Sequence, residues 1–307
     1  MTLTNLALLS QKDEFIELIV KKLGRCPLDF SERMQFIKKT GKTTEIHQAA
    51  GVLLPLRFRG ETPEGRGGGF AFQLIKRSGT VAQPGDLSCP GGLLHRFLDP
   101  LLRPFVTGRL VPILQGNALK YARRRDIETF RVITLFLTNA GRESWEEIRL
   151  SPWNVHFLGP LPTYSLTLYR RTIFPLVGFV KNPWPIRLNS EVEKVVEIPL
   201  KLFFQEGNYG LFYPPGASDQ SKPDRQGSCY PCFIYRDDEG GEEILWGATF
   251  KIIISFLQIV LEFKLPDMHA KKMIKMQRHP RYLEMIKNRS PLSDEELNVL
   301  NTDNGGR

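Results

Sequence analysis

The sequence predicts an α/β fold, in which helices cover a mixed β-sheet. Two observations support this prediction: apolar stretches typical of buried strands recur along the chain, and stretches with helical periodicity lie between them. The chain has 307 residues, of which 41% are hydrophobic and 24% are charged. A chain of this length and composition can bury a substantial core, so we expect a globular protein.

The first 48 residues are expected to form an N-terminal helical segment. In "DEFIELIVKKLG" the apolar residues fall on one stripe, and Gly24 is a stop signal. The following run, "AAGVLLPLRF" (49–58), is rich in aliphatic residues and suits a buried strand. After the loop "GETPEGRGGG", apolar residues alternate in "FAFQLIKRS" (70–78), which predicts a second strand.

Helical periodicity dominates residues 93–139, which follow the turn-rich stretch "QPGDLSCPGG". Beyond it, "NVHFLGPLPTY" and "RRTIFPLVGFV" are expected to be strands, and "SEVEKVVEIPLKLFF" a loop, a strand and the start of a helix. The stretch "EEILWGATFKIIISFLQIVLEF" predicts a strand that leads into a helix. We expect a main domain over 49–263 and a basic tail over 264–307 that is helical in part.

The formal net charge of +9 favours an anionic partner. Net charge alone leaves three partners open: a phosphorylated small molecule, nucleic acid or an acidic membrane surface. Nucleic acid is disfavoured, because no long tract dense in lysine and arginine with interleaved aromatic residues occurs, and the densest basic cluster is the short "KYARRRD" (120–126). The N-terminus does not resemble a secretion signal, and the apolar run at 250–263 is too short to span a bilayer. These features predict a cytoplasmic protein, and a homodimer remains an open alternative.

Four cysteines do not make a disulfide framework. Cys229 and Cys232 form one C-x-x-C pair, and a structural zinc would need Cys26 or Cys89 as a further ligand. The alternative is a set of reduced thiols, which we prefer.

The segment "GRESWEEIRLS" (141–151) places three carboxylates at helical offsets of three and four residues. Glu143, Glu146 and Glu147 would therefore lie on one face of a helix, where they repel one another. One interpretation is a solvated helix face on which Arg142 pairs with Glu146. The other is a metal site, because a divalent cation would offset the repulsion.

This segment resembles R-E-U-x-E-E-x-G-U, where U is a bulky aliphatic residue, which is the second half of the Nudix box. Ser144 replaces the first U, and Arg149 replaces the glycine. The first half of the motif would begin in "CPGG" (89–92). Since 49 residues separate Gly92 from Arg142, the resemblance implies that a helical insertion of 36 residues, within 93–139, divides the motif.

Three more segments resemble the coenzyme A diphosphatase branch of the Nudix hydrolases. They are "LIKRSGTVAQPGDLSCPGG", "LNSEVEKVVEIPLKLFF" and "ILWGATFKII", and they occur in the order found in that branch. The resemblance covers roughly residues 45–260. It implies a Nudix α/β/α sandwich with helical extensions at both ends.

The resemblance also implies a Mg²⁺ or Mn²⁺ site and its ligands. Glu143 and Glu147 would be the principal ligands, together with a backbone carbonyl of Gly91 or Gly92. Glu146 would be a further ligand or a water-activating base. Arg142 would hold the helix against its loop by pairing with an acid, for which Asp99 is available because Leu98 occupies the usual position.

A further catalytic acid is expected outside the box, and Glu191 is preferred, with Glu193 as the other candidate. Arg77 and Ser78 would contact the anionic substrate, as would Gly91 and Gly92. The implied reaction cleaves coenzyme A or an acyl-CoA to 3',5'-ADP and a 4'-phosphopantetheine product. A signature arginine is missing from "GTVAQ" (79–83), so ADP-ribose or a dinucleotide is an alternative substrate. A third hypothesis is a nucleotide-binding protein without turnover.

Overall fold

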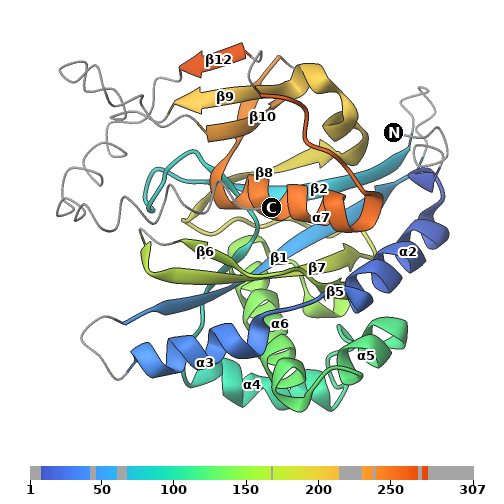
Figure 1. Cartoon of the computed structure of the whole chain (residues 1–307), viewed down its shortest axis with the longest axis vertical. Coiled ribbons are helices and arrows are strands. Elements are labelled where there is room, and N and C mark those ends of the chain that lie inside the picture. Colours follow the sequence, from blue (N-terminus) through green and yellow to red (C-terminus); the bar gives the residue numbers. More distant parts are fainter. Residues whose placement is uncertain are drawn as a thin grey trace.

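A mixed eight-stranded sheet forms the centre of the protein (Figure 1). The computed structural model describes residues 8–41, 46–60, 68–166, 169–213, 230–237, 240–268 and 272–275. The sheet has the order β3-β2-β1-β7-β5, with β4 paired to β1, β6 to β7 and β8 to β2. Its strands are β1 (Gln48–Arg59), β2 (Gly69–Arg77), β3 (Leu87–Ser88), β4 (Gly91–Leu93), β5 (Val155–Pro160), β6 (Tyr164–Leu166), β7 (Arg171–Val180) and β8 (Val192–Pro199).

The centre of this sheet is the parallel pair of β1 and β7, and the other pairings are antiparallel. Both strands are buried along most of their length, as their aliphatic sequences predict. The expected fold class, a mixed sheet with helices, is confirmed. Residues 155–180 form three strands where the sequence predicted two, because residues 161–163 interrupt the first predicted strand and divide it into β5 and β6, which both pair antiparallel with β7.

Helices cover both faces of the sheet. On one face lies α6 (Ile127–Ile148), where Phe136 stacks on Phe174 of β7 at 3.9 Å between ring centroids. The other face is covered by α2 (Lys12–Arg25) and α7 (Gly247–Leu261): Phe15 and Phe256 make edge contacts with the β2 residues Phe70 and Phe72. The remaining helices are α3 (Phe30–Thr40), α4 (Leu98–Thr107) and α5 (Gly116–Arg123), and all three contact α6.

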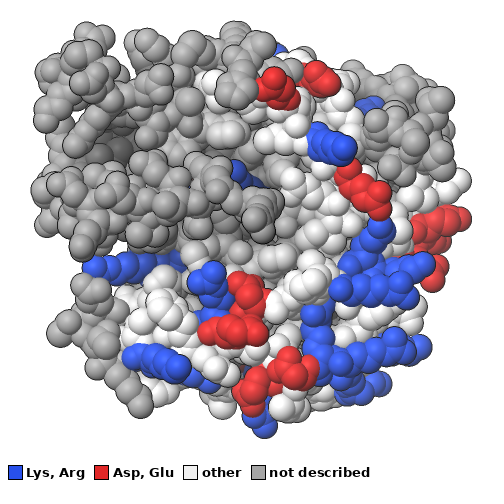
Figure 2. Space-filling model, viewed as in Figure 1, with Lys and Arg blue, Asp and Glu red and all other residues white. Residues whose placement is uncertain are grey.

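The N-terminal helix α2 is tied closely to the rest of the chain. Arg125 donates hydrogen bonds to the carbonyls of Leu23, Gly24 and Cys26 at the end of α2. Gly24 lies against the ring of Tyr121, which leaves no room for a Cβ atom. Basic side chains of α2 and α5 therefore share one surface, seen as the blue cluster at the lower right of Figure 2.

A second, four-stranded sheet was not predicted. Its order is β11-β10-β9-β12, with β9 (Tyr209–Tyr213), β10 (Tyr230–Arg236), β11 (Glu242–Leu245) and β12 (Lys272–Lys275). The short helices η3 (Leu200–Phe204) and η4 (Glu206–Asn208) precede it. The strand β11 leads directly into α7, as predicted from "EEILWGATF".

The described part of the basic tail contains no helix, and the expectation that the tail is helical in part stays a prediction. Residues 264–268 are irregular and β12 is a strand, since its backbone pairs in parallel with β9. The rest of the tail, 276–307, lies outside the described residues. None of the helices in the described ranges combines the length and apolarity needed to cross a membrane.

Candidate active site

The last two turns of α6 carry the predicted acidic segment. The helix begins at Asp126, whose carboxylate accepts the Thr129 N–H, and it runs without a break to Ile148. Arg149 ends it in the left-handed conformation, with φ of 57°, where a helix end usually places glycine. Of the three glutamates, Glu147 is buried, Glu143 is half-buried and Glu146 is exposed.

The two halves of the divided motif lie next to each other in the structure. Strand β4 pairs with β1, with Gly92 opposite Gly51, and this pairing brings "CPGG" beside the end of α6. The N–H of Gly91 donates to Oε2 of Glu147 at 2.9 Å. A Cβ atom on Gly92 would lie 2.5 Å from Cδ of Glu143, so any other residue there would displace the Glu143 carboxylate. The 49 intervening residues leave this approach intact.

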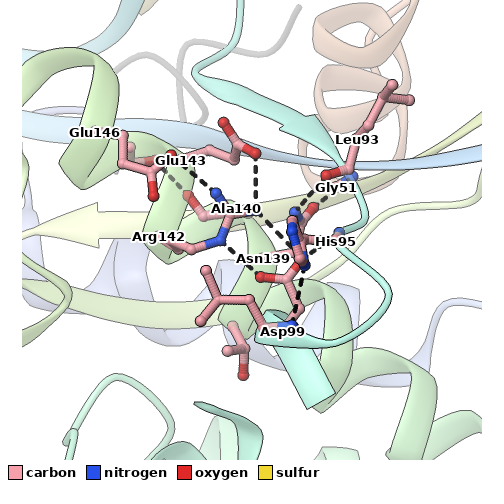
Figure 3. A network of polar contacts seen from close by, with 12 residues as sticks. Gly51, Leu93, His95, Asp99, Asn139, Ala140, Arg142, Glu143 and Glu146 are labelled. Carbon is pink, nitrogen blue, oxygen red and sulfur yellow. Dashed lines mark hydrogen bonds and ion pairs between the residues drawn. The ribbon is translucent and has the colours of Figure 1, made fainter. Parts of the chain in front are cut away.

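Arg142 gathers three carboxylates around its guanidinium (Figure 3). Its Nε donates to Oδ1 of Asp99, and its two terminal nitrogens donate to Glu143 and Glu146, each at 2.8 Å. Burial acts to lower the pKa of Arg142, but the hydrogen bond to Asp99 and the nearby glutamates raise it above its usual value. Asp99 is the fully buried partner that the sequence offered in place of Leu98.

Asn139 completes this network and was missed by sequence reasoning. It is fully buried, one turn before Glu143. Its Oδ1 accepts the Gly51 N–H, and its Nδ2 donates to the Leu93 carbonyl and to Asp99, so it joins β1, β4 and α4 to α6 (Figure 3). The available signal was a single amide within "VITLFLTNAG", a stretch that holds no charged residue.

The two inner glutamates lie in an environment that disfavours their charge. Burial raises the pKa of Glu147 to about 8; the Gly91 N–H opposes this shift, and the charge of Glu143 adds to it. Burial also raises the pKa of Glu143, and Arg142 offsets part of that shift. A cation bound beside these carboxylates would favour their charged forms and so lower both pKa values.

The end of β2 and the loop before β8 also contribute residues to the site. The charges of Arg77 and Glu191 both act on Glu147, the first lowering and the second raising its pKa. The Glu147 carbonyl accepts the Asn189 N–H, which fixes this loop against α6. Ser78 also holds the loop, because its hydroxyl donates to the Ser190 carbonyl at 2.6 Å.

Glu193 lies elsewhere, in a surface ion pair with Lys76 at 3.3 Å. Lys76 also binds Glu243 of β11, so this pair belongs to the contact between the two sheets. The structure thus separates the two acids that the sequence left as alternatives, and only Glu191 adjoins Glu147.

Comparisons with known proteins gave distant structural matches alone. No family model matches the chain, and no curated protein matches it. The Ap4A hydrolase of C. elegans is 14% identical with a TM-score of 0.30 over 50% of this chain and 81% of its own. A NUDIX hydrolase from Alicyclobacillus acidocaldarius is 11% identical with a TM-score of 0.32, and the match covers 52% of this chain and 82% of that one. The NUDIX domain of Shewanella oneidensis NrtR, in complex with ADP-ribose, is 10% identical with a TM-score of 0.30, and the match covers 53% of this chain and 82% of that one. At these TM-scores the matches support neither a family nor an activity for this chain.

The donor set of the site fits a hard divalent cation. Glu143 and Glu147 offer carboxylate oxygens, and the backbone of Gly91 and Gly92 lies against them. Within the described ranges, no group of three acidic, histidine or cysteine side chains is arranged as a complete ligand set. Magnesium does not need one, because it is commonly held by one or two carboxylates and keeps several waters.

The described cysteines show no sign of a zinc site. Cys26, Cys89 and Cys232 are free and buried, and burial raises the pKa of Cys232 to about 12. A thiol of that kind stays protonated, which disfavours metal binding. Cys229, the other half of the C-x-x-C pair, lies outside the described residues.

Proposed function

We propose that this protein is a Mg²⁺- or Mn²⁺-dependent hydrolase of the Nudix type that cleaves a diphosphate bond in a nucleotide derivative. The observation that carries the proposal is the meeting of Gly91 and Gly92 with Glu147 and Glu143. Chance does not account easily for a motif whose halves lie far apart in sequence yet assemble into one cluster with its arginine paired.

Each protein group has a distinct task in this proposal. Glu143 and Glu147 would hold the cation, and the Gly91 N–H orients Glu147 toward it. Bound there, the cation would offset the charge of the diphosphate and make a coordinated water more acidic. Arg142 fixes the carboxylates of Glu143 and Glu146, and buried Asp99 fixes Arg142.

Either of two carboxylates, Glu146 or Glu191, would accept the proton of the attacking water. The Glu146 side chain is 48% exposed, and Arg142 holds its Oε2. Glu191 lies across the site, next to the loop held by Ser78. Arg77 provides a positive charge that would bind the substrate phosphates.

Coenzyme A or an acyl-CoA is our first substrate, because the segments around Arg77, Glu191 and Trp246 resemble the coenzyme A branch. ADP-ribose and dinucleotides are the alternative. The turn after Arg77 supports these alternative substrates, because residues 79–83 contain no arginine like the one in the coenzyme A signature. The Nε of Arg77 also donates a hydrogen bond to the Ala82 carbonyl within this turn.

The test is a substrate panel with chemical identification of the products. The protein is incubated with coenzyme A, ADP-ribose or a diadenosine polyphosphate, with Mg²⁺, Mn²⁺ or a chelator. We expect metal-dependent release of 3',5'-ADP from coenzyme A, and release of AMP from ADP-ribose would favour the alternative substrate. Nucleotide binding without hydrolysis of any of these would refute the enzyme and support the binding protein.

A further inference from the structure

The helix α4 is oriented with its carboxylate inward and its apolar residues outward. Asp99 and Val106 are its buried residues. On the opposite side Phe97, Leu101 and Phe105, spaced by four residues, are 81, 69 and 47% exposed. Pro100 and Pro104 are exposed as well, so the outward face of α4 holds no charge.

This stripe continues into an apolar groove. Leu110, Trp145 and Trp153 are also exposed, and a cavity of about 500 Å³ lies between them and α4. Other side chains that line it include Leu102 and Val106. We call this continuous surface, from Phe97 to Trp153, the apolar face. Patches of this kind on a soluble protein usually mark an interaction site.

Arginines surround the apolar face. Arg96, Arg109 and Arg149 are exposed, Arg103 is partly exposed, and Arg149 lies 5.3 Å from the ring centroid of Trp145. The carboxylates within 96–110 and 145–153 do not cancel this charge. Asp99 and Glu147 are buried, and Glu146 is bound to Arg142.

The composition of the apolar face identifies the partner. Phe and Leu inserted below the headgroups, Trp at the boundary and Arg at the phosphates are the features of an interfacial amphipathic helix. We propose that the apolar face binds the surface of a membrane that contains anionic phospholipid, with α4 lying in the plane of that surface. A second copy of the chain fits less well, since a two-fold contact would bring the same arginines together.

The basic cluster of α2 and α5 supports this orientation. It includes Lys21, Lys22 and Arg25 of α2 and Lys120 and Arg123 of α5. Both α4 and α5 pack on α6, and Figure 1 places both at the lower end of the molecule. Electrostatic attraction would therefore favour approach to an anionic surface by this end.

The proposal is tested by flotation of the full chain with vesicles, without any substrate. Vesicles of phosphatidylcholine alone are compared with vesicles that contain phosphatidylglycerol, at low and high salt. We expect binding to the anionic vesicles that weakens with salt. The double variant Leu101→Gln, Phe105→Gln should bind about tenfold less tightly or worse, because two inserted side chains are lost. Its melting temperature should match that of the unaltered protein, since both positions are exposed.

The matched control is Tyr230→Ser, which removes an exposed aromatic residue of β10. This strand lies at the opposite end of Figure 1 from α4. This variant should bind vesicles like the unaltered protein. Failure to float with anionic vesicles would overturn the proposal, as would equal binding by the double variant. A dimer that dissociates on Leu101→Gln, Phe105→Gln, without vesicle binding, would assign the apolar face to a second copy instead.

Discussion

The N–H of Gly91 donates to the Glu147 carboxylate at 2.9 Å, although 55 residues lie between them in the chain. This hydrogen bond joins a short edge strand to a long helix and sets the centre of the candidate site. The Glu147 carboxylate is buried, and its pKa is raised to about 8 because burial disfavours its charge.

Replacing Glu147 by Gln should reduce diphosphate hydrolysis by at least about 100-fold, because the amide keeps the shape but not the charge that a cation needs. The measurement is product release per minute at saturating Mg²⁺. Glu193→Gln is the control, since Glu193 pairs with Lys76 outside the site, and it should retain activity within about twofold. Full activity in the Glu147 variant would refute its role as a metal ligand.

The stability of the metal-free protein should fall as pH rises from about 4.5 to about 8. Across this range unfolded chains have released the Glu147 proton and folded chains still hold it, so each rise in pH favours unfolding. Urea unfolding with chelator at pH 6 and pH 8.5 measures the effect. Glu147→Gln should weaken this dependence and be the more stable protein at pH 8.5; the raised pKa of Glu143 leaves a smaller dependence of the same sign. A dependence as steep in the variant as in the unaltered protein would contradict the assignment to Glu147.

Asp99→Asn should destabilise the fold by roughly 2 to 4 kcal/mol, because it removes the fully buried carboxylate among the three that Arg142 binds. Glu146→Gln removes another carboxylate from the same guanidinium, but that carboxylate is 48% exposed, so the cost should stay below about 1 kcal/mol. Denaturant midpoints of the two variants provide the comparison. Equal losses would mean that Asp99 does not anchor the arginine.

Gly92→Ala should impair the site more than it impairs the fold. The added Cβ would meet the Glu143 carboxylate at 2.5 Å, which must then move away from Glu147. Gly207→Ala offers a control, since a Cβ there has no neighbour within 4 Å. We expect a loss of activity of about tenfold or more in the first variant and none in the second, measured at equal folded fraction.

Arg149 ends α6 with φ of 57°, a conformation that costs a residue with a side chain more than it costs glycine. Arg149→Gly should therefore be more stable than Arg149→Ala by about 1 kcal/mol. Both variants lose the contact with Trp145, so their difference isolates the backbone. Thermal unfolding of the pair suffices, and equal stability would exclude strain at this helix end.

Much of the fold could be predicted, because most of its helices and strands have a characteristic local sequence pattern. The aliphatic run of β1 and the periodicity of α6 reflect burial, which the residue types record directly. The second sheet could not be predicted in this way. Its strand β12 is stabilised by pairing with β9, some 60 residues earlier in the chain, and a four-residue strand has no distinctive pattern.

The site was predictable in its residue types but not in its distances. Spacing along 93–141 does not reveal whether Gly92 returns to Glu143, because that depends on how α4 packs against α6. Asp99 was found because an acid was needed for Arg142. Glu191 and Glu193 could not be separated, since residues two apart in a strand share a face, and the sequence does not reveal that β8 begins at Val192 and leaves Glu191 in the preceding loop.

The hydrogen bonds from Arg125 to the end of α2 should hold the N-terminal helices on the protein after proteolysis. A cut between α3 and β1 would not release the N-terminal helices as an independent piece, because α2 shares its terminal carbonyls with Arg125 and its Leu23 side chain with β5 at Gly159. Limited proteolysis should thus yield a nicked but associated complex. Heating should melt both fragments in a single transition.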